Sequence, residues 1–135
     1  MPMEIEELNK LAAREAALKL LEERLAAFNA QDVATWKASC NFPFLRVGPR
    51  GRVTLIRAAD MVLAPYYRRL RASGWHHSAW TRREVIHAGP AKVHIDTTFV
   101  RYDAAGKELL RFDALYIVTL QDGHWGLKVQ SNYVR

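Results

Sequence analysis

Residues 116–129 read YIVTLQDGHWGLKV, and the Asp122-Gly123 pair within them decides how this stretch folds. Asp-Gly is a preferred pair for two-residue hairpin turns of the primed type, in which positive φ is required. Such a turn pairs Gln121 with His124, and strand alternation then fixes which side chains share a face. One face is apolar and carries Tyr116, Val118, Leu120, Trp125, Leu127 and Val129. We therefore predict a hairpin that packs through this face.

Two further turn signals lie upstream, at residues 87–90 and 103–106. Together with Asp122-Gly123 they divide residues 75–135 into four segments rich in Val, Ile, Thr and aromatic residues, which is typical of antiparallel strands. The second signal predicts a three-residue loop with Gly106 in the left-handed conformation. In that register His94 and Asp96 face the same side as Tyr116. A shift of one residue would move both to the opposite face.

The first half of the chain has helical periodicity. Apolar residues recur every three or four positions over residues 4–28, which predicts one amphipathic helix packed on a sheet. Asp32 is placed to cap a short second helix over residues 33–40. Residues 58–72 have the spacing of a third helix, which Pro65 should kink or split.

Short strands are also expected at residues 42–47 and 53–56, between the second and third helices. Helices followed by a strand meander indicate the α+β class. We predict three N-terminal helices packed on a curved, mostly antiparallel sheet. A chain of 135 residues fits one hydrophobic core, so residues 1–135 are interpreted as a single domain.

The composition is that of a globular protein, with 50% hydrophobic and 25% charged residues. Its apolar runs are too short to cross a bilayer and residues 1–7 are acidic where a signal peptide is basic, so we expect a cytoplasmic protein without a membrane partner. The net charge of +6 comes without a nucleic-acid-binding motif, so no nucleic-acid partner is expected. The lone Cys40 has no spacing suited to zinc or to an internal disulfide, and we expect it to be a buried thiol.

The order of elements, the FNAQDV junction at residues 28–33 and the DGHWGL hairpin at residues 122–127 resemble the SnoaL-like and ketosteroid-isomerase-like branch of the nuclear transport factor 2-like superfamily. The resemblance covers nearly the whole chain. It implies a cone-shaped domain with a pocket at its open end, usually in a homodimer joined through the sheets. Members include isomerases, polyketide cyclases, dehydratases and hydrolases as well as proteins without catalysis, so the resemblance leaves the function open.

The positions that carry steroid-isomerase chemistry in this family differ here. Such members tend to place an aspartate base before a proline after the second helix, where this chain has Phe42 before Pro43. Many members have a histidine near the end of the last strand, where this chain has Ser131. Tyr116 lies where several members have a polar residue facing the pocket. An isomerase activity of the steroid type is therefore disfavoured.

His94 and Asp96 are two residues apart on one strand, so their side chains project from one face within about 7 Å of each other. The carboxylate would orient the imidazole as a general base, and Tyr116 would donate to a developing oxyanion. An enzyme of the isomerase, cyclase or hydrolase type built on these three residues is one interpretation. A polar cluster lining a pocket is the other, because no nucleophile accompanies the pair. A metal site that adds His76 or His77 is disfavoured, and no metal and no cofactor are predicted.

Our main functional prediction is a small-molecule-binding domain with a pocket for a small, largely apolar ligand. Aromatic side chains near the junctions of helices and strands are expected to form its wall. The predicted pocket residues are Trp36, Phe42, Phe44, Tyr67, Trp80, Phe112 and Ser131.

The other face of the last two strands mixes charged and apolar residues, which suits an interface between subunits. Its members are Arg111, Asp113, Leu115, Ile117, Lys128 and Gln130. We predict a homodimer formed through this outer face, in which the apolar members are buried and Arg111 and Asp113 form ion pairs across the interface.

Overall fold

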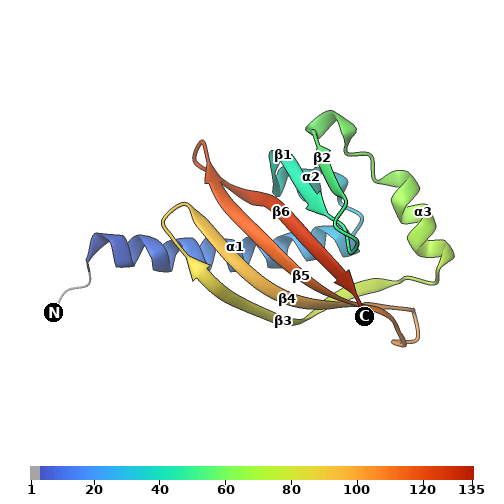
Figure 1. The fold of residues 1–135 in the computed structure, drawn as a ribbon. Coiled ribbons are helices and arrows are strands. Elements are labelled where there is room, and N and C mark those ends of the chain that lie inside the picture. Colours follow the sequence, from blue (N-terminus) through green and yellow to red (C-terminus); the bar gives the residue numbers. More distant parts are fainter. Residues whose placement is uncertain (1–3) are drawn as a thin grey trace.

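The computed structural model describes residues 4–135 and places three helices on one side of a curved sheet (Figure 1). The helices are α1 (Ile5–Asn29), α2 (Val33–Ala38) and α3 (Ala64–Ala72), with a 3-10 turn, η1 (Ala58–Asp60), before α3. The strands are β1 (Cys40–Val47), β2 (Val53–Ile56), β3 (His77–Ala88), β4 (Lys92–Tyr102), β5 (Glu108–Gln121) and β6 (His124–Val134). The predicted α+β class is confirmed. Residues 1–3, which belong to the predicted domain and its acidic start, lie outside the described residues.

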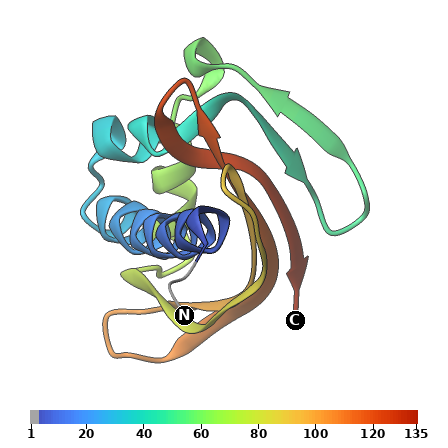
Figure 2. The ribbon, with the colours of Figure 1, turned by 90° about the vertical axis from the view of Figure 1, so that its left-hand side faces the viewer.

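The six strands form one sheet in the order β2-β1-β6-β5-β4-β3. Only the β1–β6 pair is parallel among the described strands, and the other neighbours are antiparallel. Figure 2 shows the sheet curling around α1, so that the helix lies in its concave side. Across residues 4–135, no helix is long and apolar enough to cross a bilayer.

The side of α1 that packs on the sheet consists of small and apolar residues. Ala13, Ala17 and Leu21 are fully buried against residues of β1, β4, β5 and β6. The side chain of alanine is a single methyl group, so the helix axis can approach the sheet closely. The first turns of the predicted apolar stripe do not pack in this way: Ile5, Leu8 and Leu11 are exposed because α1 extends past the edge of the sheet (Figure 1).

Local signals in the sequence place the other helices as expected. The Asp32 carboxylate accepts a hydrogen bond from the backbone N–H of Thr35 at 3.2 Å and caps α2. Pro65 splits the predicted third helix, since α3 begins with this proline in its first turn and η1 forms separately before it. Cys40 is buried and free, as expected.

Both predicted hairpin turns form. Asp122 and Gly123 have φ values of 51° and 76°, and Gln121 pairs with His124. Gly106 is left-handed with φ of 84°, and Tyr102 pairs with Glu108 to close its loop, as predicted.

The register changes just beyond the loop at residues 103–107. Tyr102 pairs with Glu108, but Arg101 pairs with Leu110, so Leu109 is an extra residue in β5. This β-bulge shifts every later pair by one residue, and Tyr116 pairs with Ile95 rather than with His94. The predicted face of His94 and Asp96 is therefore wrong: Ile95 packs on α1, and its neighbours along the strand point away from the helices.

A second bulge lies between β5 and β6. Val118 pairs with Leu127 but Ile117 pairs with Val129, so Lys128 is the extra residue. Beyond this point Gln130 pairs with Tyr116 and lies on the concave side, buried. The prediction of Gln130 on the outer face and Val129 on the inner face is wrong for the same reason.

The start of β1 is fixed to β6 by Asn41. This buried side chain donates to the carbonyl oxygens of Thr119 at 2.9 Å and His124 at 3.1 Å, and its oxygen lies 2.6 Å from Nδ1 of His124. Gly126 allows this approach, because a Cβ there would come within 2.7 Å of the Asn41 side chain and 2.9 Å of its backbone nitrogen. The lack of a side chain at this position is therefore a structural requirement.

We expect Gly126→Ala to destabilise the protein by about 1–3 kcal/mol, since the added methyl must displace Asn41 from its hydrogen bonds. Chemical denaturation gives the free energy of unfolding. Gly89→Ala is the matched control, because the nearest atom to its added Cβ is 3.7 Å away. Equal stability of the two variants would contradict the role given to Gly126.

Candidate functional site

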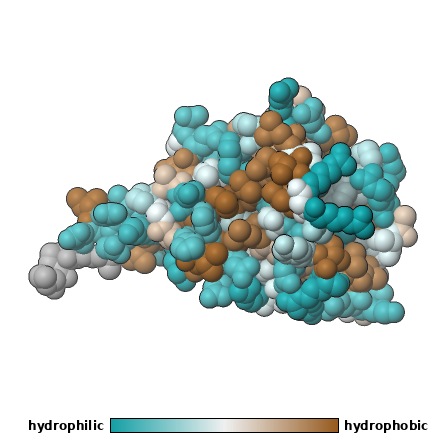
Figure 3. Space-filling view, viewed as in Figure 1, coloured by the Kyte–Doolittle hydropathy of each residue, from teal (hydrophilic) through white to brown (hydrophobic). Residues whose placement is uncertain are grey.

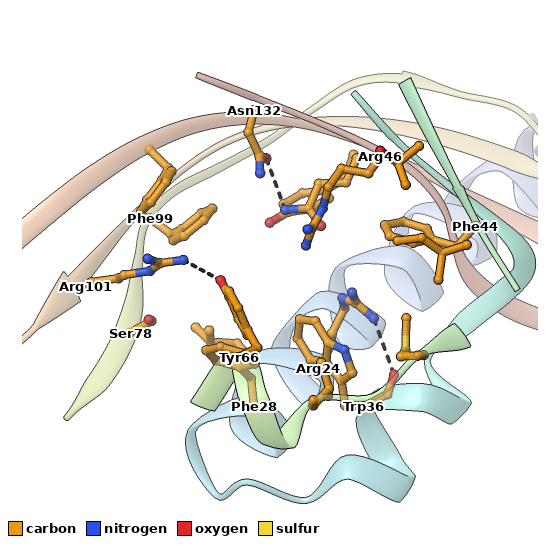
Figure 4. Close-up of a pocket in the computed structure, with 18 of the residues that line it drawn as sticks. Arg24, Phe28, Trp36, Phe44, Arg46, Tyr66, Ser78, Phe99, Arg101 and Asn132 are labelled. Atoms are coloured by element: carbon orange, nitrogen blue, oxygen red, sulfur yellow. Dashed lines mark hydrogen bonds between the residues drawn. The ribbon is translucent and has the colours of Figure 1, made fainter. Parts of the chain in front are cut away.

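A cavity of about 460 Å³ lies between the concave side of the sheet and the helices (Figure 4). Each helix and strand described above contributes at least one lining residue, so the whole fold shapes the cavity. The helices supply Arg24, Leu25, Phe28, Trp36, Tyr66 and Arg69, and the segment from η1 to α3 supplies Asp60, Met61, Val62 and Leu63. The strands supply Phe44, Arg46, Thr54, Leu55, Ile56, Ser78, Trp80, Phe99, Arg101, Phe112, Tyr116, Gln130 and Asn132.

Aromatic rings form much of the wall. Phe99 and Phe112 stack with centroids 4.7 Å apart, and Trp80 meets Phe99 edge-on at 5.9 Å. Trp80 also meets Tyr116 edge-on at 5.7 Å. Rings held in these favourable geometries give the cavity a preformed apolar surface.

Arg24 of α1 is a charged residue at the floor of this cavity, with only 3% of its surface exposed. Its guanidinium carbon lies 3.5 Å from the centre of the Trp36 ring. Nη1 donates to Ser39 Oγ at 2.6 Å, to Cys40 Sγ at 3.1 Å and to the Trp36 carbonyl at 3.4 Å. Burial lowers the pKa of Arg24, and no carboxylate among residues 4–135 lies near enough to offset that effect.

Three polar residues lie in a row across neighbouring strands on the concave side. Arg46 of β1 pairs with Gln130 of β6, and Gln130 pairs with Tyr116 of β5. Residues paired in this way point to the same face, so the row faces the cavity. Burial raises the pKa of the Tyr116 hydroxyl, with smaller opposing effects from the charges of Arg24 and Arg46. Both guanidinium groups therefore lie close enough to act on the same phenol.

A second polar cluster lies where α3 meets β4. Arg101 donates to the hydroxyl of Tyr66 at 2.5 Å and stacks its guanidinium over Phe112 at 4.6 Å from the ring centre. Arg69 lies over the Tyr66 ring at 5.8 Å. With Arg24 and Arg46, these make four arginines in the lining, against a single carboxylate, Asp60.

Residues 14–131 match the family described as NTF2-like protein (DUF6841), which spans most of the chain. The chain belongs to this family. No protein of curated function matches the sequence.

Solved structures share the NTF2-like fold at low sequence identity. An NTF2-like protein with a cystatin-like fold from Novosphingobium aromaticivorans superposes with a TM-score of 0.75 at 14% identity, covering 93% of this chain and 84% of that one. A ketosteroid isomerase-like protein from Erwinia carotovora atroseptica gives 0.64 at 18% identity, covering 93% and 95%. A protein with a cystatin-like fold from Nostoc punctiforme gives 0.69 at 11% identity, covering 87% of each chain. At these identities the likeness extends to the fold alone.

The cavity of this NTF2-like protein includes Trp36, Phe44, Trp80, Phe112 and Tyr116 from the residues named on sequence grounds.

Three predicted wall residues lie elsewhere. Tyr67 is buried in an aromatic cluster and donates its hydroxyl to the Phe28 carbonyl at 2.7 Å. Phe42 packs on the core cluster instead, in the stretch of β1 where its register with β6 shifts. Ser131 pairs with Leu115 and points outward, because the Lys128 bulge changes the face of every later residue in β6.

The proposed acid–base group does not converge on the cavity. The Asp96 carboxylate accepts a hydrogen bond from Arg82 at 2.6 Å on the outer face. The ring of His94 lies beside that of His87, and its Nε2 is buried without a hydrogen-bond partner among residues 4–135. Burial, with nearby Lys92 and His87, lowers the pKa of His94. Tyr116 lines the cavity on the opposite side of the sheet.

The lining arginines were missed by the sequence analysis, although the pattern contains a signal for them. Arg24 lies three positions after Leu21, on the buried face of α1. Arg46 lies two positions after Phe44, and Arg101 lies two after Phe99, so each shares the inward face of its strand with an aromatic lining residue. In β1 and β4, strand alternation alone therefore predicts an arginine on the same face as an aromatic residue.

We expect Tyr67→Phe to lower the free energy of unfolding by about 1 kcal/mol, because it removes the hydrogen bond that ties α3 to the end of α1. Tyr133→Phe is the control, since Tyr133 is 66% exposed. Urea denaturation of both variants measures the difference. A cost no greater than that of the control would show that this bond does not hold α3 in place.

Proposed function

We propose that this NTF2-like domain binds a small, largely apolar molecule in the cavity described above. The observation that supports this is the aromatic wall around a preformed space of about 460 Å³. Ligand sites in proteins have volumes of roughly 300–1,000 Å³ and walls that are mainly apolar with a few polar groups. Transfer of an apolar molecule from water to this surface is favourable.

The catalytic alternative has less support. It required a histidine base oriented by a carboxylate beside Tyr116, but His94 and Asp96 lie on the outer face. The described lining contains no histidine, and its single carboxylate, Asp60, is exposed and accepts a hydrogen bond from the backbone of Arg57 at 3.3 Å. Binding without these residues in an acid–base role is therefore the function we favour.

N-phenyl-1-naphthylamine, a neutral dye that fluoresces in apolar surroundings, is expected to bind at one site per chain. Asn132→Trp should weaken this binding at least tenfold, because Asn132 points into the cavity and a large ring there would occupy space that the dye needs (Figure 4). Fluorescence titration measures the affinity.

Tyr133→Trp is the matched control for this experiment, since Tyr133 is the next residue along β6 and is exposed. His94→Ala is a second control, and we expect both to keep the wild-type affinity within a factor of about two. Failure of the wild-type protein to bind the dye, or equal binding by Asn132→Trp, would contradict the proposed site. A loss of binding in His94→Ala would restore the catalytic interpretation.

We further propose that the protein forms a homodimer through the outer face of the sheet. No helix among residues 4–135 covers this face (Figure 2), and apolar side chains gather at its centre (Figure 3). The corrected register places Leu115, Ile117 and Val129 there, all half-buried. Gln130 is excluded because it faces the cavity, and Lys128 occupies the bulge and donates to Gln121 at 3.0 Å.

The charged residues of the outer face have partners within their own chain. Arg111 donates to Glu108 at 2.7 Å, and Asp113 accepts from Arg135 at 2.6 and 2.7 Å. The proposed contact therefore relies on burial of apolar surface, and the Arg111–Asp113 pairs expected from the sequence are not needed for it.

Ile117→Asp should convert the dimer to a monomer, because it places a carboxylate at the centre of the apolar contact. Sedimentation velocity at several protein concentrations distinguishes the two states. Lys107→Asp, in the exposed loop between β4 and β5, should remain dimeric. A monomeric wild-type protein, or an unchanged dimer in the Ile117 variant, would refute this interface.

A further inference from the structure

The cavity contains more positive charge than its protein neighbours offset. Four arginines line it against Asp60, and none of the four forms an ion pair within residues 4–135. Arg24 is buried and Arg101 is half-buried, whereas Arg46 and Arg69 are exposed to solvent. A cation buried without a counter-charge costs free energy, so this cost applies mainly to Arg24, and an anionic ligand would reduce it.

Arg24 is the most buried of the four, and its bonds leave part of the guanidinium available. The three protein contacts of this group all use Nη1. Among the described residues Nη2 and Nε make no hydrogen bond, and the group lines the cavity. The Trp36 ring and the Nη1 bonds hold the group in one orientation, so these free N–H donors are preorganised.

Arg46 and Tyr116 approach the same point from the sheet. Figure 4 shows the Arg46 side chain extending into the cavity on the side facing Arg24, and the charge of Arg46 contributes to lowering the pKa of Arg24 after the larger effect of burial. Within residues 4–135 Arg46 makes no ion pair or side-chain hydrogen bond. The Tyr116 hydroxyl, whose pKa is raised by burial, stays protonated at neutral pH and is a hydrogen-bond donor.

We propose that the ligand is an amphipathic carboxylate, whose head group is bound by Arg24, Arg46 and Tyr116 and whose apolar part lies against the aromatic wall. This inference rests on the proposed binding function and specifies its ligand class. A carboxylate has two oxygens in one plane, which matches the paired N–H donors of a guanidinium group. Trp80, Phe99 and Phe112 provide the surface for the apolar part.

The test compares 2-naphthoate with 2-naphthalenemethanol, which has a similar size and apolar surface but no charge. Isothermal titration calorimetry of the full chain at pH 7.5 should give at least tenfold tighter binding for the carboxylate. In Arg46→Met this preference, measured as the ratio of the two affinities, should fall to threefold or less. Arg24→Lys, which keeps the charge but loses the planar fork, should also reduce the preference.

Arg68→Met is the matched control, because Arg68 is an exposed arginine of α3 that does not line the cavity. It should keep the tenfold preference. An equal loss in this variant would indicate that the preference comes from the overall positive charge and not from specific bonds, and it would overturn the proposed head-group site. Alcohol binding as tight as carboxylate binding would overturn the ligand class and leave the binding function standing, as would binding of N-phenyl-1-naphthylamine without binding of 2-naphthoate. Absence of binding by all three compounds would overturn both proposals.

Discussion

The contact between Arg24 and Trp36 fixes the geometry on which the cavity depends. Arg24 belongs to the long helix, whereas the ring and the acceptors of its hydrogen bonds belong to α2 and the start of β1. One buried side chain therefore holds three elements together. The cost of burying its charge is offset by the stacking and by three hydrogen bonds from Nη1. Together with the Phe28–Trp36 ring contact and the pairing of β1 with β6, the Arg24 contact fixes α2 and the first strand against the end of α1 that forms the cavity floor.

The packing along α1 explains why the cavity lies at one end of the molecule. Ala13 and Ala17 allow the helix to approach the sheet, so the core there has no free space. Leu21, Arg24 and Phe28 follow on the buried side of the helix together with Ala27, and this end of the helix meets α2 and the aromatic residues around Phe28. The sheet is supported there by side chains that surround a space instead of filling it (Figure 4). Along the buried side of α1, Ala13 and Ala17 thus lie in the packed core, whereas Arg24, Leu25 and Phe28 line the cavity.

The sequence predicted the local features well because each depends on a few neighbouring residues. The Asp32 cap, the split at Pro65 and the Asp122-Gly123 turn all formed where expected. The bulges at Leu109 and Lys128 were missed, since neither residue is a glycine, the residue type that most directly marks a bulge in a sequence. An extra residue at one point reverses the face of every residue beyond it. The wrong faces for His94, Asp96, Gln130 and Ser131 all follow from these two positions.

The same two bulges determine what the cavity can bind. By moving His94 and Asp96 outward they remove an acid–base pair from the concave side, and by moving Gln130 inward they complete the row from Arg46 to Tyr116. A cavity that would otherwise have contained a histidine and a carboxylate is instead lined by arginine, amide and phenol groups. The NTF2-like fold supplies the curved sheet and the cavity against it in either case. The chemistry of the cavity therefore depends on strand register, which a likeness of fold at 11–18% identity does not specify.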